Sequence, residues 1–167
     1  RTAQSSVILP DSVTTVGEQA FSESTALTSF HIGAGVTSFA ETALYNDRKI
    51  ATLTASADNP VYSAEHNVLY RKADDGLHLM LSPAANTLTD YTVRAGTVEI
   101  GASAFANNKT LTRVVLPDGL KVIGDDAFAG TTALTELVIP ESVERSSGVT
   151  GNSLELVEYG SKVTSIR

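Results

Sequence analysis

The chain has 167 residues, enough for one domain with a substantial buried core, and its hydrophobic content of 42% excludes a disordered polypeptide. Its net charge of −7 and its lack of a lysine or arginine cluster argue against a nucleic-acid partner, because phosphate binding needs a basic face. There is no cysteine and no apolar run of the roughly 18–20 residues that a membrane-spanning helix needs, so we expect no disulfide, no thiolate zinc site and no membrane span.

A short apolar pair recurs along the chain at a fixed interval. Its copies are, in chain order, Ala20-Phe21, Ala43-Leu44, Ala104-Phe105 and Ala127-Phe128. Phe21 and Leu44 are 23 residues apart, and so are Phe105 and Phe128, whereas Leu44 and Phe105 are 61 residues apart. The longer interval equals one period plus an irregular unit of 38 residues. A period of this length predicts a solenoid, in which each repeat adds one coil.

Each repeat starts with a pattern that predicts a short strand. The pattern is Leu-x-x-apolar-x-apolar, and its alternation places two or three side chains in the core. It begins, in chain order, at Leu27, Ile50 (a degenerate copy, IATLTA), Leu88, Leu111, Leu134 and Leu154. Proline follows it at Pro10, Pro117 and Pro140 and is expected to end the strand, because proline cannot donate to a ladder.

The rest of each repeat predicts the return across the core. A second apolar pair turns the chain back, and a glycine (Gly17, Gly101 or Gly124) is expected at a tight bend with a positive φ. The alanine is expected where the next coil comes close, and the phenylalanine fills the interior. Small polar residues three positions later should bond the backbone at a turn: Ser24, Asp47, Asn108 and Thr131.

The full motif, Leu-x-x-Ile-x-Ile-Pro-x-x-Val-x-x-Ile-Gly-x-x-Ala-Phe, resembles the BspA-type leucine-rich repeats of bacterial surface proteins. The resemblance covers roughly residues 7–143 and the tail from Leu154. It implies a leucine-rich repeat solenoid of α/β type, built mainly from short parallel strands with turns and short 3₁₀ or helical segments. The chain departs from the family in having no cysteine after the phenylalanine. It also departs after Val143, where ERSSGVTGN is expected to form a shortened or loosely ordered coil.

The irregular 38-residue unit, residues 53–90, also resembles segments that interrupt these repeats. Val68–Lys72 and Leu77–Leu81 predict two strands of a β-hairpin about a glycine turn, which should project from the rim or extend one sheet. We expect residues 1–167 to form a single solenoid domain. We also expect them to belong to a longer chain, because the repeat is cut at Gln4 and at Ile166-Arg167 and an open solenoid end exposes core residues.

Residues that could carry chemistry have simpler structural interpretations. The carboxylate pair Asp125-Asp126 is expected to cap exposed N–H groups at a short helical turn. Asp74-Asp75-Gly76 lacks the spacing of a calcium loop and predicts a hairpin turn. Ser103 lacks the final glycine of a nucleophile elbow, and the three histidines are far apart in sequence. We therefore expect no catalytic, metal or cofactor site and no enzymatic activity.

The remaining candidate is the outer face of the strands. Stacking places the fifth residue of each strand pattern in one outward column, which comprises Ile8, His31, Thr54, Thr92, Val115, Val138 and Glu158. The outward valines and isoleucine indicate either plain β-propensity or an interaction patch. With the charged neighbours included, the candidate partner-binding residues are His31, Thr92, Arg113, Val115, Glu136, Val138 and Glu158.

The resemblance implies non-enzymatic recognition or adhesion by a cell-surface or secreted bacterial protein. The expected partner is a host or matrix protein, or another cell-surface protein, bound on the concave sheet face. Two alternatives remain: a structural spacer that holds another domain away from the cell wall, and an accessory module of a carbohydrate-active surface protein.

Overall fold

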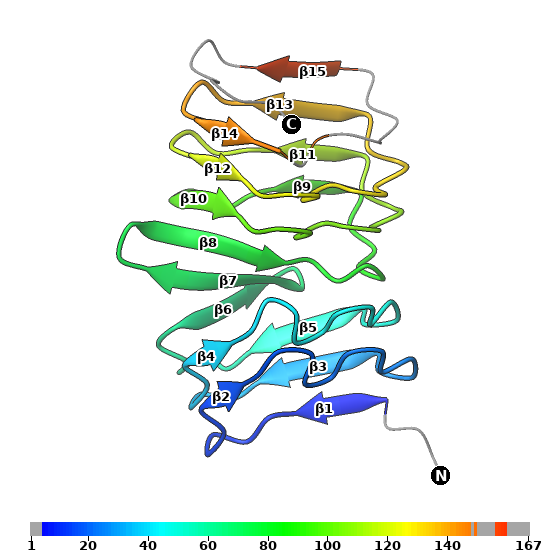
Figure 1. Ribbon diagram of the computed structural model, residues 1–167, viewed down its shortest axis with the longest axis vertical. Helices are drawn as coiled ribbons and strands as arrows, with labels where there is room; N and C mark the ends of the chain where they lie inside the picture. The colour runs from blue at the N-terminus through cyan, green and yellow to red at the C-terminus, as the bar shows by residue number, and fades with distance from the viewer. Residues whose placement is uncertain (1–4, 148, 150–155, 160–167) are drawn as a thin grey trace.

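Figure 1 shows a stack of coils that rises from the N-terminal to the C-terminal end of the chain. The computed structural model describes residues 5–147, 149 and 156–159, the last four by their backbone alone. The strands along these residues are β1 (Ser6–Ile8), β2 (Thr15–Val16), β3 (Ser29–Ile32), β4 (Ser38–Phe39), β5 (Thr52–Ala55), β6 (Tyr62–Glu65), β7 (Val68–Ala73), β8 (Gly76–Leu81), β9 (Asp90–Thr92), β10 (Thr97–Ile100), β11 (Arg113–Val115), β12 (Val122–Ile123), β13 (Glu136–Ile139), β14 (Arg145–Ser146) and β15 (Leu156–Tyr159).

The expected short helical segments do not form in the described residues, where each return loop is a series of turns. Two positions of the loop have a positive φ, which interrupts a right-handed helix. The residues at these positions are Gln19, Ser103 and Asp126 at the first, and Glu23, Asn46, Asn107 and Gly130 at the second. Consequently, no helix in the described part of the chain could cross a membrane.

The first strands of the coils form two parallel sheets rather than one. The N-terminal sheet has the order β1-β3-β5, and the C-terminal sheet has the order β15-β13-β11-β9. Each strand pairs with the strand one period away: Ser29 lies opposite Thr52, and Arg113 lies opposite Glu136. The 23-residue period read from the sequence therefore sets the register of both sheets.

The short second strands form the opposite side of the stack. Strands β2 and β4 pair with each other, and β10, β12 and β14 continue into the strands of the irregular unit in the order β14-β12-β10-β8-β7-β6. Because β14 pairs in register with β12, the degenerate unit after Val143 keeps the second-strand column.

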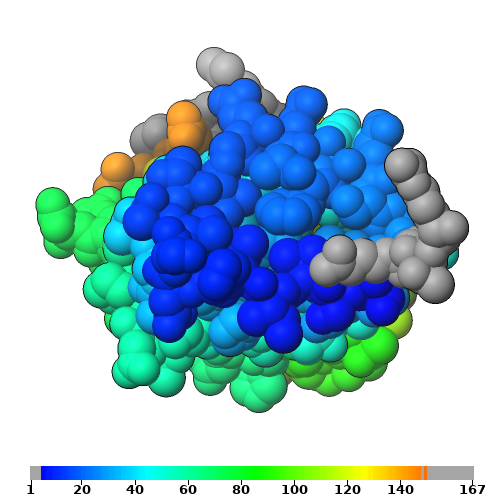
Figure 2. Space-filling model, turned by 90° about the horizontal axis from the view of Figure 1, so that it is seen from below, coloured from blue at the N-terminus to red at the C-terminus, as the bar shows by residue number. Residues whose placement is uncertain are grey.

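The irregular unit is an antiparallel meander of β6, β7 and β8. The predicted hairpin is confirmed: β7 pairs antiparallel with β8, which lies parallel to β10 and so extends the second-strand sheet. Its turn also reaches beyond the neighbouring coils in both views (Figures 1 and 2). The extra strand β6 was not predicted. It joins β7 through His66 and Asn67, whose φ values of 51° and 63° suit a two-residue hairpin turn.

Strand β7 divides the hydrophobic core. Val68, Leu69 and Tyr70 are consecutive and all fully buried. Successive side chains of a strand point to opposite faces, so Leu69 packs into the N-terminal core, whereas Val68 and Tyr70 pack into the C-terminal core. Tyr70 donates to, or accepts from, the hydroxyl of Tyr91 at 2.6 Å, which satisfies both buried phenols. The irregular unit thus forms a partition across the solenoid.

The apolar columns lie where the repeat predicts. Phe105 and Phe128 are fully buried and stack with ring centroids 5.1 Å apart. Ala104 and Ala127 beside them are also fully buried. Phe21 is only partly buried because its loop lies in the N-terminal coil and has a neighbouring loop on one side.

The bend glycines serve a different purpose from the one expected. Gly17, Gly101 and Gly124 do not have positive φ values. A Cβ added at Gly124 would lie 2.7 Å from the backbone nitrogen of Ala102, so glycine is needed there because the neighbouring coil passes too close. The polar residues after the phenylalanine behave as predicted: Asn108 Oδ1 accepts the N–H groups of Thr110 and Leu111.

Candidate functional site

Six of the seven candidate partner-binding residues lie on the C-terminal sheet. Thr92, Val115, Val138 and Glu158 occupy one row of directly paired positions across β9, β11, β13 and β15. Arg113 and Glu136 face each other two positions earlier on β11 and β13. The parallel strands therefore hold these positions side by side.

His31 does not join this group. It lies on β3 of the N-terminal sheet, between Ile8 and Thr54, and its Nδ1 is 2.8 Å from Thr54 Oγ1. The expectation of one continuous column is therefore wrong. Thr54 and Thr92 are the last and first members of separate rows, because the irregular unit separates β5 from β9.

The β6–β7 turn occupies the interval between the two sheets. The side-chain oxygen of Asn67 accepts the backbone N–H of Leu53 on β5 at 3.2 Å, and the His66 ring lies 6.4 Å from the Tyr91 ring on β9. Arg94 forms a 3.2 Å ion pair with Glu65. A groove of about 460 Å³ opens along this boundary and is lined by Glu65, His66, Leu88, Asp90, Tyr91, Thr92, Val93, Arg94 and Ala95.

The C-terminal sheet presents an apolar strip beside a charge pair. The side chain of Val138 is 43% exposed, and Val115 is partly exposed next to it. Arg113 Nε lies 2.8 Å from Glu136 Oε1, and this carboxylate raises the pKa of Arg113. Both charged side chains are about half exposed, so they remain available to a partner.

The residues considered for chemistry occupy separate structural positions. The Asp125-Asp126 pair lies in a turn rather than at a helix start, and the Asp125 carboxylate accepts the Ser147 hydroxyl instead of capping a helix. The predicted turn at Asp74-Asp75 is confirmed. The histidines lie on β3, in the β6–β7 turn and on β8, and no cluster of possible metal ligands occurs among the described residues.

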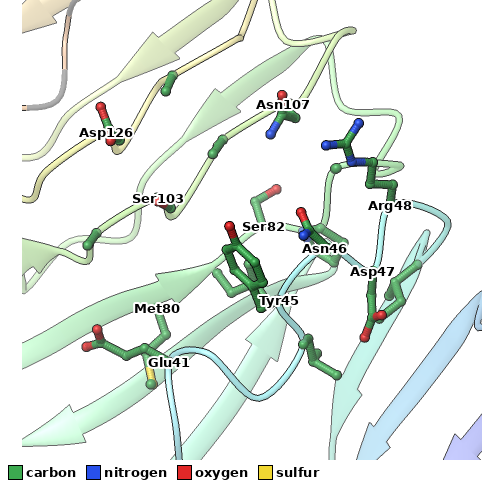
Figure 3. Close-up of a pocket in the computed structure, with 18 residues that line it drawn as sticks. Glu41, Tyr45, Asn46, Asp47, Arg48, Met80, Ser82, Ser103, Asn107 and Asp126 are labelled. Atoms are coloured by element: carbon green, nitrogen blue, oxygen red, sulfur yellow. The ribbon is translucent and has the colours of Figure 1, made fainter. Parts of the chain in front are cut away.

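A second concave feature, which the sequence interpretation missed, lies among the return loops. We call the stacked loops of residues 17–24, 40–47, 101–108 and 124–131 the loop stack. Between its second and third loops is a notch of about 330 Å³ with Met80–Ala84 as its floor (Figure 3). Its walls include Glu41, Tyr45, Arg48 and Asp126. The available signal was that the 38-residue unit contains no Gly-x-x-Ala-Phe loop, so one position of the stack is not filled.

Comparison with known families gives a match along most of the chain. The model of the BspA type Leucine rich repeat region matches residues 1–71 and 84–167, in six copies. No curated protein matches the chain.

Solved structures share the fold. A leucine rich cell surface protein from Faecalibacterium prausnitzii is 26% identical, with a TM-score of 0.68 over 90% of this chain and 52% of that one. A leucine-rich repeat protein from Eubacterium ventriosum is 23% identical, with a TM-score of 0.70 over 95% of this chain and 55% of that one. The pneumococcal vaccine antigen PcpA is 18% identical, with a TM-score of 0.70 over 94% of this chain and 51% of that one. The present chain thus spans about half the length of these proteins.

Proposed function

Because the chain belongs to the BspA-type leucine-rich repeat family, we propose that it is a non-enzymatic recognition module of a cell-surface or secreted bacterial protein. Its partner is a host or matrix protein, or another cell-surface protein, and it binds on the C-terminal sheet. The similarity to a leucine rich cell surface protein supports this location.

The in-register row on β9, β11, β13 and β15 carries the proposal. Repeat proteins commonly bind through the broad surface of their stacked strands. Here the row contains the exposed Val138 beside the paired charges of Arg113 and Glu136. Centres of interfaces favour apolar residues and arginine, with other charges at the rim. The net charge of −7 favours a basic or neutral partner and an association that weakens with salt.

A pair of charge-matched variants tests the site. The test variant combines Arg113→Glu and Val138→Asp on the C-terminal sheet. The control combines Ile8→Asp, Thr52→Glu and Thr54→Asp on the N-terminal sheet and changes the net charge equally. All five side chains are exposed, so both variants should fold, as circular dichroism can verify. Partners are selected with the unmodified chain on an array of host matrix proteins and bacterial cell-surface proteins.

We expect the test variant to bind the selected partner at least roughly 30-fold more weakly and the control variant to bind unchanged. Loss of binding by the control alone would place the site on the N-terminal sheet and contradict the proposal. If no array protein bound the unmodified chain, the recognition role would give way to that of a structural spacer.

A further inference from the structure

The loops of the stack are joined by a repeated pair of backbone hydrogen bonds. In the first loop, the N–H groups of Phe21 and Glu23 donate to the carbonyl groups of Ala43 and Tyr45 at 2.9 and 3.0 Å. The third loop repeats the pattern one period apart: the N–H groups of residues 105 and 107 donate to the carbonyl groups of residues 127 and 129, both at 2.7 Å. Each loop therefore offers two donors, two residues apart, to the next loop.

The pattern is incomplete at the irregular unit. The matching donors of the second loop are the N–H groups of Leu44 and Asn46, and neither makes a hydrogen bond within the described residues. On the opposite wall, the Ala104 carbonyl accepts the Ser82 N–H at 2.7 Å, but the Ala106 carbonyl accepts no hydrogen bond from the described residues. The notch thus has two open donors on one wall and one open acceptor on the other.

The side chains of the notch add an apolar floor and two charged ends. Tyr45 is 57% exposed and stands over Met80–Ala84. In Figure 3, Glu41 and Asp126 lie on one side of Tyr45 and Arg48 lies on the other. None of these three charged side chains forms an ion pair with another described residue. The notch therefore has an acidic end and a basic end.

We propose that this notch binds a short peptide segment of a partner protein, which takes the position of the loop that the irregular unit lacks. Peptide carbonyl groups two residues apart accept the N–H groups of Leu44 and Asn46, and a peptide N–H donates to the Ala106 carbonyl. This is the backbone pairing by which exposed strand edges recognise peptides. It fits a polypeptide better than a glycan, because only a polypeptide presents carbonyl groups at this regular spacing.

The charges define the order of side chains in the bound segment. Neighbouring loops run parallel, so the N-terminal end of a bound segment lies near Glu41 and its C-terminal end lies near Arg48. A basic residue should therefore precede, and an acidic residue should follow, an apolar residue that packs on the floor and against Tyr45. This site is separate from the C-terminal sheet and does not depend on the function proposed for that surface.

Synthetic peptides provide a direct test. The probe is acetyl-KSAFANE-amide, which places the chain's own loop sequence, residues 103–107, between the required charges. The charge-swapped control is acetyl-ESAFANK-amide. Affinity is measured by titration of the full chain, and amide NMR reports the binding site. We expect the probe to bind about tenfold more tightly than the control and to slow hydrogen exchange at Leu44 and Asn46.

A protein variant with exchanged charges completes the test. Glu41→Lys, Arg48→Glu and Asp126→Asn alter exposed side chains, and asparagine tolerates the positive φ at position 126. We expect this variant to prefer the charge-swapped peptide. Equal binding of both peptides by the unmodified chain, or no change at the Leu44 and Asn46 amides with either peptide, would overturn the proposal. Shifts at Tyr45 with oligosaccharides but not with peptides would also overturn it and assign the notch to a glycan.

Discussion

Replacing Asp47 by asparagine should stabilise the fold. Asp47 occupies the position that Asn108 holds in a later coil, and its side chain is 6% exposed. Its Oδ1 accepts the Ser24 N–H at 2.6 Å, but Oδ2 is buried without a hydrogen-bond partner in the described structure. Asn108, in contrast, uses its Nδ2 to donate to the Asn86 carbonyl. A buried polar atom without a partner costs roughly 1–3 kcal/mol, so we expect Asp47→Asn to add about 1–2 kcal/mol of stability at pH 7.

The pH dependence provides a second test of the same reasoning. Burial raises the pKa of Asp47 above its ordinary value of 3.8. The folded state therefore holds the proton more tightly than the unfolded state, and ionisation of this group weakens the fold at neutral pH. The penalty disappears as the pH falls through the raised pKa. The stability difference between the variant and the unmodified chain should thus be largest at pH 7 and shrink toward pH 4.

Urea unfolding followed by circular dichroism, at pH 7 and at pH 4, measures this difference. Asp58→Asn, at an exposed position, is the control and should change stability little at either pH. A variant at position 47 that is no more stable than the unmodified chain at pH 7 would refute the argument. So would a gain that is unchanged at pH 4.

Two further substitutions examine the core and the bends. Phe128→Ala removes a fully buried stacked ring and should cost about 3–5 kcal/mol in denaturant unfolding, whereas a cost below about 1 kcal/mol would contradict the assigned core position. Gly124→Ala places a Cβ against the backbone of the adjacent coil and should cost about 1–3 kcal/mol, as measured by thermal and urea unfolding. The control Gly17→Ala has open space around its Cβ and should be nearly neutral; equal losses at both positions would argue against close approach as the cause.

The sequence predicted the repeated parts of the fold because one period controls both the strand pairing and the core columns. The pairing of Arg113 with Glu136 follows directly from that period. The return loops were less predictable, because an alanine-phenylalanine pair suits a helical turn as well as a turn with positive φ. At Ser103 and Asp126 the backbone adopts the second conformation.

The irregular unit explains why the candidate site was only partly predictable. Alternation identified the outward residues, but the path of the inserted strands separates Thr54 from Thr92. Such a path depends on pairing between distant strands, which local pattern does not specify. One usable signal was the apolar run Val68-Leu-Tyr, since a strand buried on both faces loses its polar alternation. The notch likewise results from a loop that is missing, and no residue pattern marks it directly.

The partition formed by β7 has a consequence for folding cooperativity. In a repeat array, each coil is stabilised chiefly by its immediate neighbours, and the outermost coils need a cap. One face of β7 closes the N-terminal core through Leu69, and the other closes the C-terminal core through Val68 and Tyr70. The meander therefore acts as an internal cap shared by two half-arrays. Communication of stability from one half to the other must pass through this single strand, so the two halves can behave as separate cooperative units within one continuous chain.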